Sequence, residues 1–209
     1  MLLLIDKPKG ITSHDVVDIV RRKTGERRVG HAGTLDPLAS GLLIIGVGRE
    51  STKLLGNLSK NTTKTYEAEI TLGATSDTDD GEGVISLGSS LRINRAEIIK
   101  TLKEFVGEQD QIPPNYSAIK LQGKKAYELA RKGLSLSLSL RKVTIHSIKL
   151  IDYLYPKINI VCEVSSGTYI RSLARDIGAK LGTGAYLSAL RRTKIGDYDI
   201  VKAKTIDQL

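Results

Sequence analysis

Residues 30–43 of the chain read GHAGTLDPLASGLL and place a single carboxylate, Asp36, among small and hydroxylated side chains. A glycine-rich loop followed at once by the apolar run 42–47 indicates a loop at the mouth of a buried strand. A carboxylate displayed there is suited to act as a nucleophile or a general base. The alternative is a turn aspartate in front of Pro37. The loop alone leaves both interpretations open.

A second group of candidate residues lies in the sequence SGTYIRSL at 166–173. If Thr168 caps a helix over 169–181, Arg171 falls in the first turn. A cation there opposes the helix dipole at a cost of about 0.3–1 kcal/mol, which a paired carboxylate would offset. Arg171 is therefore either paired with a carboxylate or solvated at the surface. Arg175 is one turn further along the same face, where contact with a phosphate is an option.

Three other features carry weaker signals. Tyr66 lies in the alternating segment 65–72, which predicts a half-buried strand in which tyrosine is common. His31 precedes Asp36 in the same loop, where a lone histidine is usually solvated. The acidic sequence SDTDDGEG at 76–83 fails as a calcium loop, because glycine is fifth rather than sixth and Gly88 replaces the closing glutamate. A solvated turn is the simpler interpretation of that segment.

Composition limits the class of protein. The chain has 209 residues and a net charge of +9, which favours a polyanionic partner such as nucleic acid over a merely soluble basic protein. One cysteine, Cys162, excludes an internal disulfide and a multi-cysteine zinc site, and three histidines form no cluster with it. No apolar run approaches the roughly 20 residues of a membrane span, and the N-terminus lacks signal-peptide character. We expect a cytoplasmic protein without a membrane segment or a metal.

Periodicity and turn residues predict the elements that position these candidates. Thr12 with Asp15 predicts a capping box, and Asn94 predicts a second helix start. Residues 134–140 alternate Leu and Ser, as an exposed strand or a low-complexity loop would. The interspersed elements lack a steady βαβ rhythm and indicate an α+β fold with a mixed sheet. The predicted strands are 2–6, 42–47, 65–72, 143–153 and 157–164, and the predicted helices are 13–23, 50–57, 94–105, 124–132 and 169–181.

The same segments resemble, in the same order, the motifs of the TruB family of tRNA pseudouridine synthases. The matching motifs are LIDKPKGITS at 4–13, GHAGTLDPLASGLL at 30–43, KTYEA at 64–68, SGTYIRSL at 166–173 and GAYLSALRR at 184–192. The resemblance implies a pseudouridine synthase fold, with a mixed, mainly antiparallel central sheet flanked by helices. It also implies one catalytic domain over 1–209, with an RNA-gripping insertion at about 109–141.

The resemblance further implies the isomerisation of uridine to pseudouridine at position 55 of the tRNA TΨC arm, with the target base flipped out. Asp36 is then the nucleophile, Arg171 the cation that keeps it ionised, and Tyr66 the group that stacks on the base or moves a proton. Because the reaction involves no redox change and no net hydrolysis, no cofactor is expected.

The resemblance gives the remaining site residues supporting roles. His31 contacts the RNA as the base is extruded, Tyr169 and Leu190 line the pocket, and Asp80 links electrostatically to the active-site arginine. Basic clusters that include Arg191 are candidates for holding phosphates.

We expect a monomer that binds the TΨC stem-loop without an obligate protein partner. The chain stops just past the catalytic core, so the C-terminal PUA-type domain of longer members is expected to be absent and RNA binding to be weaker and more salt-sensitive. Two alternatives are a non-catalytic RNA-binding or tRNA-folding protein and a subunit of a guide-RNA-directed complex. The continuation LASGLL after Pro37 favours a stand-alone enzyme.

Overall fold

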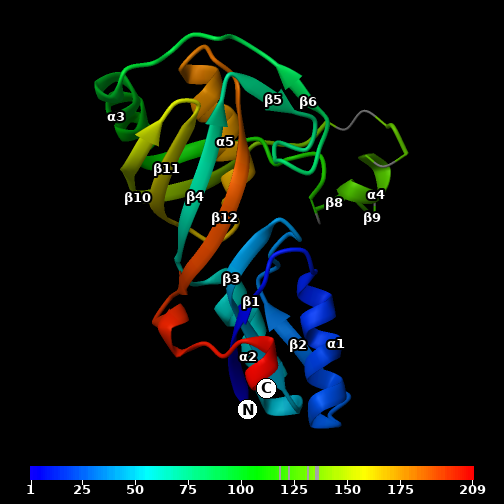
Figure 1. The fold of residues 1–209 in the computed structure, drawn as a ribbon. Coiled ribbons are helices and arrows are strands. Elements are labelled where there is room, and N and C mark those ends of the chain that lie inside the picture. The colour runs from blue at the N-terminus through cyan, green and yellow to red at the C-terminus, as the bar shows by residue number, and fades with distance from the viewer. Residues whose placement is uncertain (118, 122, 131, 135–136) are drawn as a thin grey trace. The chain divides into compact units, whose positions relative to one another are not determined.

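The structure is a computed structural model that describes residues 1–117, 119–121, 123–130, 132–134 and 137–209. Its elements form two compact units, seen in Figure 1. Unit 1 comprises Met1–Ala68, Val161–Gly167 and Ala189–Leu209, and unit 2 comprises Glu69–Ile160 and Thr168–Ser188. Neither unit is one contiguous segment. Three strands contribute residues to both: β4 (Lys64–Leu72), β11 (Lys157–Val164) and β12 (Ala185–Ile195).

The first helix of unit 1, α1 (Ser13–Thr24), begins at the predicted capping box. The Thr12 hydroxyl accepts a hydrogen bond from the Asp15 N–H at 3.0 Å, and the Asp15 carboxylate accepts one from the Thr12 N–H at 2.7 Å. Gly25 ends the helix with a φ of +67°, a conformation that glycine adopts readily. The buried apolar side chains of α1 are Val16, Val17 and Val20.

The sheet of unit 1 is built around β3 (Ala39–Val47). β1 (Leu2–Lys7) pairs antiparallel with residues 41–46 of β3. β2 (Val29–Ala32) pairs antiparallel with residues 44–47, whereas β12 pairs parallel with residues 39–41. Because β1 covers one edge of β3, β2 and β12 follow each other along the opposite edge. The loop 33–38, which carries Asp36, joins β2 to β3 at this place.

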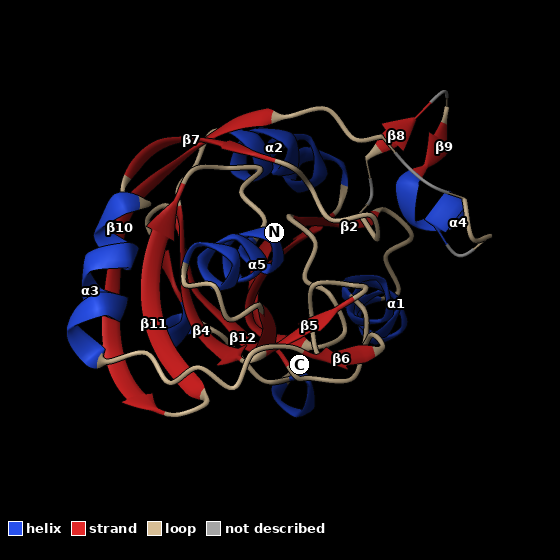
Figure 2. Cartoon of the chain, turned by 90° about the horizontal axis from the view of Figure 1, so that it is seen from above, coloured by secondary structure: helices blue, strands red, loops and turns tan. Residues whose placement is uncertain are grey.

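Among the described residues, unit 2 holds the strands that lie between β4 and β11 in the sequence and three helices. β10 (Arg141–Leu154) pairs antiparallel with β7 (Gly107–Gln111), and α3 (Arg95–Glu104) lies beside β10 (Figure 2). The buried helix is α5 (Ile170–Lys180). Smaller elements are β5 (Ala74–Ser76), β6 (Ile85–Leu87), β8 (Lys120–Leu121), β9 (Lys124–Lys125) and α4 (Ala126–Ala130).

Hydrogen-bonded strands follow the order β1-β3-β12-β4-β11-β10-β7 in a mixed sheet, with β2 and β13 (Tyr198–Asp199) off this path. α2 (Arg49–Lys60) packs on β2 and β3, and two short 3-10 helices follow β13 at Ile200–Lys202 and Ile206–Gln208. The α+β composition and the mixed sheet confirm the predicted fold class.

Several details differ from the sequence expectations. β2, β7 and β12 were not predicted, and residues 124–125 form a strand in place of the first turn of the expected helix. The N-cap of α5 is Tyr169 without a side-chain hydrogen bond, so the predicted Thr168 cap is wrong, although Arg171 still lies in the first turn. Residues 134 and 137–140 form no helix or strand, and 135–136 lie outside the described residues.

Candidate active site

Asp36 occupies the loop between β2 and β3 and is half-buried. The backbone on either side of it is fixed by hydrogen bonds within unit 1. The Gly10 N–H donates to the Pro37 carbonyl at 2.8 Å, and the Ala39 N–H donates to the carbonyl of Asp36 itself at 3.0 Å. Leu35, directly before Asp36, is 3% exposed and anchors the loop in the core. The carboxylate is thus carried by a loop with little conformational freedom.

Ser13 holds the same loop from the first residue of α1. Its hydroxyl donates to the Leu35 carbonyl at 3.0 Å and accepts from the Leu35 N–H at 2.8 Å. Both backbone polar groups of Leu35 are therefore satisfied by one side chain that is itself 2% exposed. The sequence motif that precedes α1 is in this way connected to the aspartate loop.

Arg192 of β12 reaches the loop from another direction. Its Nε donates to the Leu42 carbonyl at 2.8 Å, and its Nη2 donates to the Gly33 carbonyl at 2.9 Å. Although Arg192 is 1% exposed, it takes part in none of the ion pairs formed by the described residues. One buried guanidinium thus bonds to the residues at both ends of the segment that contains Asp36.

Two more predicted site residues lie in unit 1. Tyr66 is 8% exposed on β4, where Lys64 and Ala68 are buried on the same face. Leu190 is half-buried on β12 and stands in register with Ala39, the first residue after the aspartate loop. Leu190 is therefore close in the sheet to the end of that loop, as an apolar pocket wall would be.

His31 lies on β2 in register with Ile45 of β3. Its Nδ1 is buried and has no hydrogen-bond partner. Burial lowers the pKa of His31 below its ordinary value, and the positive charges of Arg192 and His14 lower it further. Both effects favour the neutral form of the ring.

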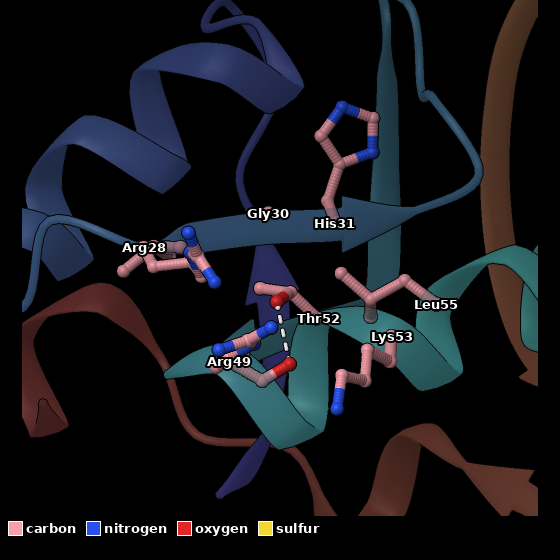
Figure 3. Close-up of a pocket in the computed structure, with 8 residues that line it drawn as sticks. Arg28, Gly30, His31, Arg49, Thr52, Lys53 and Leu55 are labelled. Carbon is pink, nitrogen blue, oxygen red and sulfur yellow. Dashed lines mark hydrogen bonds between the residues drawn. The ribbon is translucent and has the colours of Figure 1, made fainter.

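An open depression of about 590 Å³ lies between β2 and α2 in unit 1. Figure 3 shows α2 alongside β2, with the His31 ring projecting from β2 on the side away from α2. Gly30 permits this close packing, since a Cβ there would lie 3.1 Å from Leu55 Cδ1. The lining residues include three cations and no acid; they are Arg28, Val29, Gly30, His31, Arg49, Thr52, Lys53 and Leu55. We call this hollow the basic depression.

Unit 2 carries the predicted arginine. Arg171 is 6% exposed, and its Nη1 lies 3.4 Å from Asp80 Oδ2, the ion pair that the family resemblance implies. Its Nη1 and Nη2 also donate to the carbonyls of Thr78 and Tyr116 at 3.2 and 2.9 Å. Because Asp80 is 3% exposed as well, the two opposite charges share one buried environment.

Arg175 has partners of its own in unit 2. Its Nη1 and Nε lie 2.9 Å from the carboxylates of Asp79 and Asp176, and its Nη2 donates to the Ile112 carbonyl at 3.0 Å. Burial nevertheless raises the pKa of Asp79, against the opposing effects of Arg175 and Arg171. A phosphate would have to displace these partners, so the RNA-binding role of Arg175 stays a prediction.

Tyr169 is placed by a residue that sequence reasoning did not identify. The side-chain amide of Gln111, 4% exposed, donates to the Tyr169 carbonyl at 3.1 Å and accepts from its N–H at 2.8 Å. This pair of bonds occupies the N-cap position of α5. No local pattern identifies such a contact, because Gln111 and Tyr169 are far apart in the sequence.

Arg191, predicted to hold phosphate, forms a two-pronged ion pair with Asp6. Its Nη2 and Nη1 lie 2.7 and 3.1 Å from the two carboxylate oxygens. The side chain is 39% exposed, so a phosphate could reach it in competition with Asp6. This role too stays a prediction.

The single thiol is packed in the core. Cys162 on β11 is 0% exposed, and burial raises its pKa to about 12. Within the described part of the chain, no three His, Cys, Asp or Glu side chains gather in a way that would hold a metal ion. The helices that the structure describes are all too short or too polar to cross a membrane.

Comparison with known sequences assigns the family. Residues 21–170 match the family described as TruB family pseudouridylate synthase (N terminal domain), which alone is more than half of the chain. The chain belongs to the TruB family. Residues 171–209 match a second TruB family description, the tRNA pseudouridylate synthase B C-terminal domain.

Individual TruB family members are similar over the whole chain. The identity is 46% to tRNA pseudouridine synthase B of Thermobifida fusca (strain YX), with 73% of that protein covered. It is also 46% to tRNA pseudouridine synthase B of Azoarcus sp. (strain BH72), with 69% covered. Among solved structures, a Cbf5-Nop10-Gar1 complex matches with a TM-score of 0.75 and 29% identity, covering 99% of this chain and 53% of that one. The chain thus spans about half the length of the solved chain that it matches, and the predicted pseudouridine synthase fold is confirmed.

Proposed function

We propose that this TruB family chain is a tRNA pseudouridine synthase, an isomerase that converts a uridine of tRNA into pseudouridine. The observation that carries the proposal is a carboxylate, Asp36, on a loop whose backbone is fixed on both sides by buried hydrogen bonds. Such a loop presents a nucleophile in one place without reorganisation. The uridine at position 55 of the TΨC arm is the target that the family resemblance implies.

The reaction rearranges one nucleoside. The bond between C1′ and N1 breaks, the base turns, and a bond forms between C1′ and C5. The proton on C5 is lost and N1 gains one, so that no group is added or removed. A transient covalent bond between the Asp36 carboxylate and the substrate divides this exchange into easier steps.

Arg171 and Tyr66 complete the proposed machinery. Arg171 supplies positive charge that favours the ionised form of a nearby carboxylate. Tyr66 offers an aromatic face on which the extruded base stacks and a hydroxyl that moves a proton at C5. In this proposal His31 contacts the RNA as the base is extruded, and Tyr169 and Leu190 line the pocket that receives the base.

The basic depression supports the choice of RNA as substrate. Arg28, Arg49 and Lys53 line it, and although Lys53 is ion-paired with Glu50, no carboxylate belongs to the lining, which suits a phosphate backbone. Extruding a stacked base costs a few kcal/mol, and phosphate contacts offset that cost.

We further propose that the protein acts in the cytoplasm as a monomer, without an obligate protein partner.

The experiment is pseudouridine formation in an unmodified tRNA transcript by purified wild type and by Asp36→Asn. We expect conversion at one site by wild type and none by Asp36→Asn, with RNA binding retained by both. Conversion by both would mean that Asp36 is not the nucleophile. Binding without conversion by either would point to an RNA-binding protein or to a missing guide RNA.

A further inference from the structure

The buried guanidinium of Arg192 stands apart from the groups given a role in the reaction. Taking a cation out of water is unfavourable unless hydrogen bonds or an opposite charge compensate it. For Arg192 the compensation comes from the carbonyls of Gly33 and Leu42. An apolar side chain would fill this space without the desolvation cost. What it could not do is donate hydrogen bonds to two carbonyls at once.

Those two carbonyls bracket the catalytic segment. Gly33 is the first residue of the loop after β2, and Leu42 lies in β3 beyond its end. The backbone of Arg192 is fixed as well, because it stands in parallel register with Gly41. Gly33 and Gly41 have φ angles of +79° and +105°, so a glycine with a positive φ lies on each side of Asp36. Arg192 therefore contacts the backbone at or next to both glycines.

Ser13 supplies an independent attachment in the middle of that segment. It bonds both backbone polar groups of Leu35, the residue directly before Asp36. Arg192 and Ser13 belong to different elements, β12 and α1, and act on different residues of the loop. Together they leave the Asp36 backbone little freedom to shift or rotate.

We propose that Arg192 and Ser13 are positioning residues for the isomerisation, which hold the Asp36 carboxylate in its attacking position before RNA binds. The inference rests on the proposed synthase activity and adds two residues to it. Neither residue touches the substrate. Their effect on rate comes from geometry, since a misplacement of about 1 Å at a reacting group costs on the order of 10²-fold in rate.

The test separates position from stability. Conversion of the tRNA transcript is followed in single turnover with enzyme in excess, over a range of enzyme concentrations. The saturating rate constant then reports the chemical step and is independent of the active fraction, while the half-saturating concentration reports RNA binding. The variants are Ser13→Ala, Arg192→Met and Arg192→Lys. The matched control is Val20→Ala, a core truncation on the same helix as Ser13.

We expect Ser13→Ala and Arg192→Met to lower the saturating rate constant at least 10-fold, with the half-saturating concentration within about threefold of wild type. Val20→Ala should lower the thermal midpoint about as much as Ser13→Ala does, and it should leave the saturating rate constant unchanged. Arg192→Lys keeps the charge but lacks the planar fork that reaches two carbonyls, so it should fold and remain slow. If Arg192→Met does not fold, Ser13→Ala and Arg192→Lys carry the test.

A wild-type rate constant in Ser13→Ala and Arg192→Lys, with only the thermal midpoint reduced, would overturn the proposal and make both residues merely structural. Failure of the proposed function has a different signature, because wild type and Val20→Ala would then be inactive too.

Discussion

Gly41 and Arg192 face each other across β3 and β12 so closely that a Cβ on Gly41 would lie 2.3 Å from the Arg192 carbonyl oxygen. The same Cβ would lie 2.7 Å from the Arg192 nitrogen. Real Cβ atoms do not approach backbone atoms this closely, and backbone cannot swing aside as a side-chain tip can. The contact joins the strand that leaves the aspartate loop to the strand that carries its buried arginine.

Gly41→Ala should therefore be strongly destabilising. The steric overlap, together with a φ of +105°, costs roughly 3 kcal/mol or more. For a chain of this size that lowers the thermal midpoint by about 6–12 °C. Differential scanning calorimetry measures the shift. Gly56→Ala is the matched control, because Gly56 lies inside α2 with open space around it and should gain a little helix stability. Equal midpoints for the two variants would contradict the packing described.

His31 should titrate below its ordinary pKa of 6.5, because burial and then Arg192 disfavour its protonated form. Only three histidines are present, so proton NMR can follow each ring, and His31→Gln identifies the signal. Arg192→Met should raise the pKa of His31 by removing a positive charge. Because the unfolded chain binds this proton more tightly than the folded chain, His31 should lower the free energy of unfolding as pH falls below about 6.5. Titration of His31 above 6.5 would show that the ring is not enclosed as described.

Lys64 should make stability rise with pH in the alkaline range. Burial, followed by the charge of Arg192, lowers the pKa of Lys64 from 10.5 to about 8. The unfolded chain therefore binds more protons between about pH 8 and 10.5, and folding is favoured as pH increases through that window. Below about pH 8 the amine is charged in both states and its contribution is constant. Thermal midpoints of wild type and Lys64→Met, measured in parallel, should diverge with pH only in that window.

The basic depression should contribute to the salt dependence of tRNA binding. The double variant Arg28→Gln with Arg49→Gln should weaken binding and reduce the slope of log K against log salt by about 1 to 2, because each lost phosphate contact removes about 0.9. Lys149→Gln, an exposed cation on β10, is the control and should leave the slope unchanged. Fluorescence titrations of tRNA binding at several salt concentrations measure this slope. An unaltered slope in the double variant would place the phosphates elsewhere.

The sequence predicts the parts of the fold that local chemistry determines. The capping box of Thr12 and Asp15, the Asn94 cap and the apolar run of β3 all form as expected. β12 was missed because Arg191, Arg192 and Lys194 interrupt any apolar alternation along it. A strand with a buried arginine looks polar until its hydrogen-bond acceptors are known, and those acceptors come from a distant part of the chain.

The residues of the candidate site also fall into those that the sequence could identify and those that it could not. Asp36 could be singled out because the glycines and Pro37 around it indicate a loop in front of a buried strand, whereas Tyr66 could be singled out only through the family resemblance. Ser13, Gln111 and Arg192 could not, because each acts through backbone groups that are remote in sequence. A hydroxyl, an amide or a guanidinium leaves no periodic signal of the carbonyl that it binds.

The discontinuity of unit 1 has a consequence for synthesis on the ribosome. Domains generally fold as the chain emerges from its N-terminal end. The aspartate loop is made early, yet β12, which supplies Arg192, is made after every strand except β13. A partly translated chain already contains Asp36 but still lacks Arg192, whose hydrogen bonds hold the segment around it. Nascent chains should therefore lack a fully positioned nucleophile until translation has passed β12.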